Sequence, residues 1–322
     1  MKKQIVAVTR KIPKAGLSLL ENKFDLRLSP HDRVLNQREL KKFVKGASAI
    51  LSQLTDKIDS AVLRAAGPEL KIAANYAVGY DNIDLAAAKK RKVIVTNTPG
   101  VLTEAVAEHT FALLMSAARR IVESDKFTRA GKYKAWAPEL LLGQQLQGKT
   151  IGIIGLGRIG TRVGEIAALG YKMKVIYFDR GRSNRELDRA IGSRAVTMRK
   201  LLTASDFISL HVPLTPKTKH MIDARELKTM KRGGILLNTS RGAVINEKAL
   251  ASALKAGIIR GAAIDVFEHE PKITPLLKRL DNIVMTPHTA SATVEARDAM
   301  AVMAAKNIIV VLEGGKPLNP VS

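Results

Sequence analysis

Short apolar runs alternate along the chain with longer stretches in which apolar residues recur every three or four positions. The short runs predict strands, and the longer periodic stretches predict helices. In the first hundred residues the expected strands are Gln4–Val8, Asp25–Leu28, Ala49–Ser52, Lys71–Ala74 and Val93–Asn97. Helices are expected between them, for example over Asn36–Lys45 and Ile83–Arg91. This alternation predicts parallel βαβ units and argues against a sandwich or a helical bundle.

A similar series occupies the second half of the chain. Its expected later strands are Phe207–Val212, Gly234–Asn238, Gly261–Val266 and Ile283–Thr286, and its expected last helix is Thr293–Glu313. The fold class that follows is α/β, with two doubly wound parallel-sheet domains.

The two series are separated by an interruption. It begins with Thr103–Ile121, which we expect to form one long amphipathic helix. The buried face of this helix is expected to carry Ala107, Phe111, Leu114 and Ala118. Residues 132–139 then show no periodicity and hold Trp136, the only tryptophan. Trp136 could lie in a core, on a dimerisation arm, or over the substrate cleft of a neighbouring subunit.

Composition is that of an ordinary globular protein. The 322 residues suffice for two domains with large cores, and 46% of them are hydrophobic and 25% charged. No apolar run reaches membrane-spanning length, and the apolar run near the N-terminus is too short for a signal peptide. The absence of cysteine excludes disulfides and thiolate catalysis. We therefore expect a cytoplasmic location.

The formal net charge of +24 is high. It could indicate a nucleic-acid partner. However, the basic residues are scattered, and the longest run, Lys89–Lys92, falls at the end of an expected helix, where cations suit the helix dipole. Aromatic residues make up only 4%, and no basic–aromatic motif appears. We expect a basic surface that attracts an anionic substrate and cofactor, with no nucleic-acid or membrane partner.

A glycine-rich segment opens the second series. Thr150–Gly160 has the pattern of a strand, a turn and the start of a helix. Gly155 would permit a tight turn, Gly157 would let a pyrophosphate approach the backbone, and Gly160 would let the helix pack close to the strand. The N–H groups at the helix start would then face the phosphates. The segment therefore predicts a dinucleotide site.

Asp179 ends the next expected strand, 19 residues beyond Gly160. A carboxylate there can accept hydrogen bonds from the adenosine ribose hydroxyls. A 2′-phosphate would instead meet like charge, at a cost of about 4 kcal/mol per charge pair at close range. Arg180 and Arg182 are near enough in sequence to offset part of that cost. NAD(H) is therefore the expected cofactor, and NADP(H) stays open as a second one.

Three polar residues, Arg241, Glu270 and His288, each follow an expected strand of the second series. Ligands of open parallel sheets lie outside the carboxyl ends of strands, so these side chains are expected to converge beside the dinucleotide. An Arg can grip a carboxylate, a His can deliver a proton as hydride arrives at carbon, and a Glu can stabilise the protonated His. The trio predicts hydride transfer to a 2-oxo acid.

The remaining histidines carry no such pattern. His109 is expected to serve packing or an interface, and His211 to be structural. No cluster of His, Asp and Glu has the spacing of metal ligands, so no metal is expected.

Further motifs extend over nearly the whole chain. They are Asn75–Asp84, Thr96–Gly100, Gly148–Gly160, His211–Thr215, Asn238–Gly242, Ala263–Phe267 and Thr286–His288. On these segments the chain resembles the D-isomer-specific 2-hydroxyacid dehydrogenases, and among them most closely the glyoxylate/hydroxypyruvate reductases.

The resemblance implies a role for each matched residue. Arg241 matches the substrate-binding arginine, Glu270 the supporting glutamate, and His288 the acid/base histidine. Val78 and Gly79 match the loop whose backbone N–H groups bind the substrate carboxylate, and Leu51 and Ser52 match a second wall of that pocket. The implied cofactor residues are Thr103, Gly155, Gly157, Arg158, Ile159, Asp179, Arg180, Val212, Pro213, Thr239, Asp265, His288 and Ser291. Among them, Asp265 matches the acid that holds the nicotinamide amide.

The resemblance also implies the domain organisation. Residues 1–100 and 289–322 would form a flavodoxin-like substrate domain, and residues 101–288 would form a Rossmann cofactor domain inserted into it. The site would lie in the cleft, where closure would exclude water. Dimers of the family favour the arm for Trp136, so a homodimer is expected.

The expected activity is NADH-dependent reduction of small anionic 2-oxo acids, glyoxylate and hydroxypyruvate, to 2-hydroxy acids, with the D-isomer formed where the product is chiral. One alternative is a dehydrogenase of a larger D-2-hydroxy acid or of a sugar acid of the 2-ketogluconate type. Another is a non-enzymatic NAD-sensing protein similar to the corepressors that share this fold, which keep the same trio.

Overall fold

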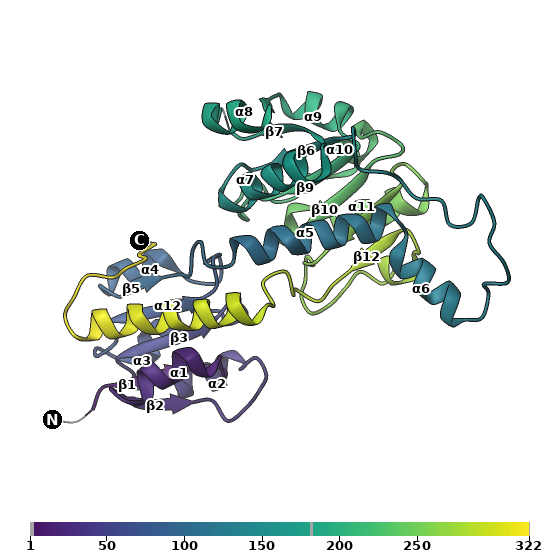
Figure 1. The fold of residues 1–322 in the computed structure, drawn as a ribbon. Helices are drawn as coiled ribbons and strands as arrows, with labels where there is room; N and C mark the ends of the chain where they lie inside the picture. The colour runs from purple at the N-terminus through teal and green to yellow at the C-terminus, as the bar shows by residue number, and fades with distance from the viewer. Residues whose placement is uncertain (1–2, 181–182, 322) are drawn as a thin grey trace. The chain divides into compact units, whose positions relative to one another are not determined.

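Two parallel sheets, one of five strands and one of seven, are present in the computed structural model, which describes residues 3–180 and 183–321 (Figure 1). Each sheet belongs to its own compact unit. Unit 1 comprises residues up to Leu102 together with those from Ala292 onward, and unit 2 runs from Thr103 to Ser291. The expected α/β fold class with two doubly wound sheets is confirmed.

The sheet of unit 1 has the order β2-β1-β3-β4-β5, which is that of a flavodoxin-like fold. Its strands are β1 (Ile5–Val8), β2 (Asp25–Leu28), β3 (Ala49–Gln53), β4 (Ile72–Tyr76) and β5 (Ile94–Thr96). Its helices are α1 (Lys14–Glu21), α2 (Gln37–Phe43), α3 (Ser60–Ala66), α4 (Leu85–Lys90) and α12 (Val294–Leu312). Side-chain caps fix several helix starts: Asn36 and Glu39, for example, form a capping box at α2.

Helix α12 comes from the far end of the chain and packs on α1. A Cβ on Gly16 of α1 would come within 2.5 Å of the Ala301 carbonyl oxygen, so the two helices approach at their backbones. At the end of β4, the Tyr76 hydroxyl donates to the Arg297 carbonyl oxygen at 2.8 Å. These contacts make α12 an integral part of unit 1.

The sheet of unit 2 has the order β12-β11-β10-β9-β6-β7-β8. Its strands are β6 (Thr150–Ile154), β7 (Lys174–Phe178), β8 (Arg194–Ala195), β9 (Phe207–Leu210), β10 (Ile235–Asn238), β11 (Gly261–Ile264) and β12 (Ile283–Met285). Its helices are α5 (Thr103–Ala118), α6 (Ile121–Arg129), α7 (Arg158–Glu165), α8 (Arg185–Ile191), α9 (Met198–Ala204), α10 (Ala224–Thr229) and α11 (Glu247–Lys255). The strand order reverses between β6 and β9, which is where a doubly wound sheet binds its ligand.

Two apolar clusters cover the sheet of unit 2. One is built around Leu236, Ile208 and the residues of α11, and the other around Ile153, Tyr177 and the buried face of α5. None of the helices in the described part of the chain combines the length and apolar character that crossing a bilayer would require.

The expectation of a single helix over Thr103–Ile121 is wrong at its C-terminal end. Helix α5 stops at Ala118, and α6 begins at Ile121 after Arg120, which adopts a left-handed backbone with φ of 56°. The cause is a contact from a distant segment: the Gln144 N–H donates to the Ala118 carbonyl oxygen at 2.7 Å. That carbonyl would otherwise accept a helical hydrogen bond. The four residues expected on the inner face of α5 are all buried, as predicted.

Candidate active site

The glycine-rich turn joins β6 to α7. A Cβ on Gly155, where φ is +93°, would come within 2.6 Å of the His211 carbonyl oxygen, and a Cβ on Gly160 would overlap the Gly155 carbonyl oxygen. A Cβ on Gly157 would meet no atom within 4 Å. The turn is therefore tightly packed at Gly155 and Gly160, and it is open at Gly157, where a phosphate would approach.

Helix α7 starts directly at this turn. Gly157 is its N-cap and provides no side-chain cap. Throughout the described residues, the N–H groups of Arg158 and Ile159 donate to no acceptor. Uncapped N–H groups at a helix start attract anions, so these residues fit the pyrophosphate of a dinucleotide.

Asp179 follows β7 and contacts the same turn. Its Oδ2 accepts a hydrogen bond from the Leu156 N–H at 2.8 Å. This contact fixes the carboxylate beside the glycines, and its second oxygen can still accept a ribose hydroxyl. Arg180 is exposed next to it. Arg182, the second arginine weighed against cofactor preference, lies outside the described residues.

The other expected cofactor residues of unit 2 lie at strand ends or helix starts. Thr103 begins α5, Val212 and Pro213 follow β9, Thr239 follows β10, and Ser291 lies in the loop after β12. Two contacts tie members of this set to their surroundings. Val212 Cγ1 lies 2.8 Å from the position of a Cβ on Gly155, and the Thr239 hydroxyl lies 3.1 Å from the Thr110 hydroxyl of α5.

Glu270 and His288 form a hydrogen-bonded pair. Nδ1 of His288 lies 2.9 Å from Oε2 of Glu270, and Oε1 of Glu270 accepts the Phe267 N–H at 3.0 Å. The backbone of His288 is left-handed, with φ of 56°, and its N–H donates to the Asp265 carbonyl oxygen at 2.8 Å. With Nδ1 engaged, Nε2 is the ring nitrogen that can exchange a proton with a substrate.

The environment keeps Glu270 ionised. Burial by itself would raise its pKa, but the hydrogen bond and charge of His288, the Phe267 N–H and the charge of Arg241 outweigh burial and hold the pKa of Glu270 below its ordinary value. An ionised glutamate can only accept a hydrogen bond, so it keeps a proton on Nδ1 of His288 and orients the ring.

Gly242 allows the loop after β10, which carries Arg241, to pack against the loop after β11, which carries Glu270. A Cβ on Gly242 would overlap both the Phe267 carbonyl oxygen and the Glu268 nitrogen. The two backbones are thus in direct contact, and any side chain at residue 242 would separate them. On the Arg241 side, the Asn238 amide donates to the Arg241 carbonyl oxygen at 2.9 Å.

Asp265 organises the loop that carries His288. Its fully buried carboxylate accepts the Thr286 hydroxyl at 2.6 Å and the N–H groups of Thr289 and Ala290, each at 2.8 Å. Burial would raise the pKa of Asp265, but these donors and His109 together lower it. What the carboxylate would do toward a nicotinamide amide stays a prediction.

His109 is a site residue that the sequence did not reveal. Its Nε2 lies 3.0 Å from the Thr286 hydroxyl and 3.5 Å from the Asp265 carboxylate. The sequence predicts only packing or an interface for this residue. No local signal could have identified it, because its partner Thr286 lies 177 residues away in sequence.

The expected substrate-binding residues of unit 1 lie where β3 and β4 end. Leu51 and Ser52 belong to β3 and are fully buried, and the Ser52 hydroxyl donates to the Asn75 side chain at 3.0 Å. Val78 and Gly79 form the loop after β4 and are partly exposed. Ser52 therefore bonds to a neighbour of this loop, and its role as a second wall of the substrate pocket stays a prediction.

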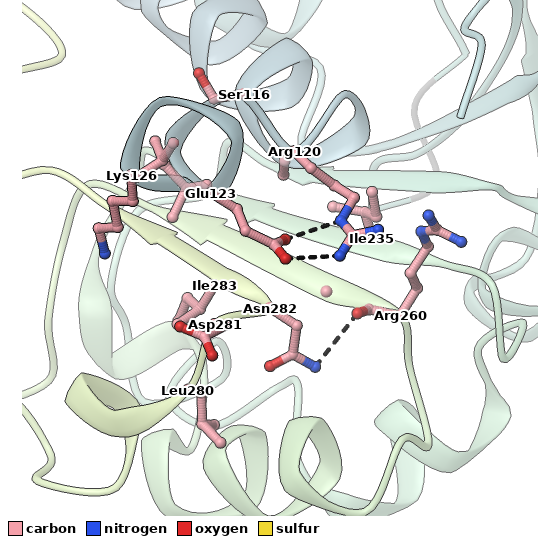
Figure 2. A pocket seen from close by; sticks show the side chains of 14 residues that line it. Ser116, Arg120, Glu123, Lys126, Ile235, Arg260, Leu280, Asp281, Asn282 and Ile283 are labelled. Atoms are coloured by element: carbon pink, nitrogen blue, oxygen red, sulfur yellow. Dashed lines mark hydrogen bonds and ion pairs between the residues drawn. The ribbon is translucent and has the colours of Figure 1, made fainter. Parts of the chain in front are cut away.

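A separate cavity of about 300 Å³ lies at the opposite edge of the unit 2 sheet. Figure 2 shows its lining, which includes the ion pair of Arg120 with Glu123 and the Asn282 side chain donating to the Arg260 carbonyl oxygen. β10, β11 and β12 begin here, whereas open parallel sheets bind ligands where strands end. This cavity is therefore not the candidate active site. Across the described residues, no group of three or more His, Cys, Asp or Glu is placed to hold a metal ion.

Comparison with known proteins gives one consistent result. A family described as D-isomer specific 2-hydroxyacid dehydrogenase, NAD binding domain, matches residues 111–290. A glyoxylate reductase of Korarchaeum cryptofilum is 50% identical over 320 residues, which covers 98% of this chain and 95% of the relative. A solved structure from Thermus thermophilus has a TM-score of 0.92 and 43% identity, covering 99% of this chain and all of the other. An NADPH-dependent glyoxylate/hydroxypyruvate reductase from Sinorhizobium meliloti, solved with NADP and malonate, has a TM-score of 0.85 and 29% identity, covering 100% and 97%.

Proposed function

The chain belongs to the D-isomer-specific 2-hydroxyacid dehydrogenase family, and on this basis we propose that it reduces glyoxylate to glycolate with NADH. The observation that carries the proposal is the hydrogen bond between His288 and Glu270, in the unit that also holds the dinucleotide turn. The full-length relative named glyoxylate reductase, half of whose residues are identical, supports the choice of substrate.

The proposed roles follow from the chemistry of each group. A bound nicotinamide cofactor supplies the hydride. His288 donates the proton that the carbonyl oxygen gains, and Glu270 stabilises the protonated imidazole and fixes its orientation. Arg241 binds the substrate carboxylate and polarises the adjacent carbonyl. In unit 1, the resemblance implies that the N–H groups of Val78 and Gly79 bind a substrate carboxylate.

For the cofactor we propose a preference for NADH over NADPH. The support is Asp179, whose carboxylate is held at the glycine turn by the Leu156 N–H. A 2′-phosphate beside it would be repelled. The exposed Arg180 reduces this repulsion, and the Sinorhizobium relative uses NADPH. We therefore expect a preference for NADH without complete exclusion of NADPH.

The deciding experiment is steady-state oxidation of NADH, followed by its absorbance, with a panel of 2-oxo acids. The panel includes glyoxylate, hydroxypyruvate, pyruvate, a branched long-chain 2-oxo acid and 2-ketogluconate. We expect glyoxylate to give the highest kcat/KM, with hydroxypyruvate next. A higher kcat/KM for the long-chain acid or for 2-ketogluconate would favour the larger-substrate alternative. Binding of NADH without turnover of any acid would favour a non-enzymatic NAD sensor.

We also propose that the protein forms a homodimer through residues 121–142. Large hydrophobic side chains are exposed over this segment of unit 2, including Ile121, Tyr133, Leu142 and Trp136, which is 79% exposed. Such a concentration of apolar surface is typical of a protein interface. Sedimentation velocity should give the mass of a dimer, and Trp136→Asp should shift the equilibrium toward monomer. A monomeric parent protein would refute this assignment.

A further inference from the structure

In the loop after β4, consecutive carbonyl groups each accept a hydrogen bond from a specific donor. The Ala77 carbonyl oxygen accepts the Thr98 N–H at 2.9 Å. The next two carbonyl oxygens are held by asparagine side chains: Val78 by the Asn97 amide at 2.7 Å, and Gly79 by the Asn75 amide at 2.8 Å. Three consecutive carbonyl groups thus have donors.

Because peptide groups are planar, fixing these carbonyl groups also fixes the direction of the N–H groups that follow them. In a trans peptide the N–H points away from the carbonyl of the preceding residue. The N–H groups of Val78, Gly79 and Tyr80 therefore point away from Thr98, Asn97 and Asn75, respectively. Within residues 3–180 and 183–321, none of these three N–H groups donates a hydrogen bond. The chain bends at Ala77 and Val78, and successive N–H groups in a turn can make an anion-binding concavity.

The two asparagines are themselves fixed. Asn75 is fully buried, and its Oδ1 accepts the Ser52 hydroxyl at 3.0 Å and the Asn82 amide at 3.2 Å. The Asn82 amide also donates to the carbonyl oxygens of Gln53 and Asp56. The Asn75 amide therefore has little freedom to release Gly79.

Asn97 is fixed by the C-terminal segment 318–321, which we call the strap. The Asn97 N–H donates to the Asn319 carbonyl oxygen at 3.3 Å, and the Val321 N–H donates to the Val95 carbonyl oxygen at 3.0 Å. The strap is held in turn by Asn307, fully buried in α12, whose Oδ1 accepts the N–H groups of Leu318 and Asn319 at 2.9 and 3.1 Å. A continuous chain of hydrogen bonds thus links α12, the strap, Asn97 and Val78.

We propose that Asn75 and Asn97 are positioning residues that aim the N–H groups of the 78–80 loop at the substrate carboxylate, and that the strap maintains Asn97 in this role. The inference rests on the proposed function, because that function gives the loop its carboxylate ligand. It predicts that substrate affinity depends on side chains that never touch substrate.

The test is Asn97→Asp, which keeps the shape of the side chain but removes the donor to Val78. We expect the KM for glyoxylate to rise about tenfold or more, because a misdirected loop loses hydrogen bonds to a charged group. The KM for NADH should stay unchanged, and kcat should fall less than KM rises. Oxalate serves as a non-reacting carboxylate probe, and calorimetric titration into the NADH-bound enzyme should show its Kd weakened by the same factor.

A second variant deletes residues 318–322 and should raise the KM for glyoxylate in the same direction, even if Asn97→Asp lowers the yield of folded protein. Two controls should leave both readouts at the parent value. Asn282→Asp changes an asparagine that also donates to backbone carbonyls. Asn282 lies in unit 2, beside the cavity where β10, β11 and β12 begin (Figure 2). Leu318→Ala removes an exposed side chain of the strap.

The outcomes separate this inference from the proposed function. An active parent enzyme whose folded Asn97→Asp variant keeps the parent KM and oxalate affinity would overturn the positioning role and leave the function intact. A parent that reduces no 2-oxo acid would refute the function, and the oxalate titration would still decide whether Asn97 and the strap shape an anion site.

Discussion

Oε2 of Glu270 lies 2.9 Å from Nδ1 of His288, on loops that follow the neighbouring strands β11 and β12. Gly242 allows the loop of Arg241 to pack directly on the same region. Because Arg241 and His288 both lower the pKa of Glu270 against the effect of burial, the carboxylate keeps its charge below the ordinary titration range of a glutamate. The carboxylate therefore stays able to accept the hydrogen bond of His288 down to a pH below the ordinary range of a glutamate.

Glu270→Gln tests this pairing. The amide keeps the size of the side chain but cannot stabilise a charged His288, so we expect kcat to fall roughly 10- to 100-fold. In the parent, the Glu270 carboxylate stabilises His288 above the lowered pKa of Glu270, and this stabilisation is lost as the pH falls through that pKa. The acid limb of kcat/KM should therefore lie below the ordinary titration range of a glutamate. A pH profile of kcat/KM checks both points. His269→Gln, which alters an exposed neighbour, should change neither.

Replacing His288 and replacing Arg241 should affect different kinetic constants. His288→Ala removes the proton donor, and we expect kcat to fall roughly 10²- to 10⁴-fold. Arg241→Ala removes a carboxylate ligand, and we expect mainly a higher KM for the 2-oxo acid. Full Michaelis–Menten curves separate the two effects. A His288→Ala enzyme with near-parent kcat would mean that the mechanism is wrong.

Asp179→Ser should weaken the discrimination between cofactors. Removing the carboxylate removes its repulsion of a 2′-phosphate, so the ratio of kcat/KM for NADH to that for NADPH should fall at least about tenfold. The comparison requires both cofactors at a fixed, saturating concentration of glyoxylate. Arg180→Ser, the matched change beside it, should move the ratio the other way. If the parent already prefers NADPH, the role given to Asp179 is incorrect.

Gly242→Ala should disturb the site through the backbone. A Cβ there would overlap the Phe267 carbonyl oxygen, so the loop 267–270 would have to move. We expect a loss of stability of about 1–3 kcal/mol and a lower kcat. Gly233→Ala is the control, because its Cβ would meet only the flexible end of Gln144 at 3.5 Å. Chemical unfolding and turnover measured on both variants would settle the difference.

His211 should make the stability of unit 2 depend on pH. Burial lowers the pKa of its imidazole to about 4, and its Nε2 lies 2.8 Å from the Ser209 hydroxyl. Since an unfolded histidine titrates near 6.5, the unfolded state binds the proton first as the pH falls. The stabilisation that neutral His211 gives to unit 2 is therefore complete above about pH 6.5 and is lost as the pH falls toward 4. The free energy of unfolding should fall by at most about 3 kcal/mol over this range. Urea unfolding of the parent and of His211→Gln at pH 7 and pH 5 should show a smaller pH effect in the variant. Equal pH effects in both would contradict this account.

Much of the architecture could be predicted from the chain because its signals are local. Apolar periodicity located every strand core of unit 1 and the four buried residues of α5. Gly160 follows a similarly local rule, since it must leave room for the backbone of Gly155, whereas Gly155 must leave room for the distant backbone of His211. The long helix was predicted wrongly at its end because Gln144, which is distant in sequence, donates to the carbonyl group at which α5 stops.

The kinds of residue at the strand ends, and hence the chemistry they can perform, could be read from the chain alone. Which of these residues meet depends on the folded arrangement. His109 reaches Thr286, and the strap reaches Asn97, across separations that no repeat or spacing encodes. The physical reason is that strand and helix periodicity is set by neighbours along the backbone, whereas the orientation of a loop is set by whichever distant donors satisfy its carbonyl groups.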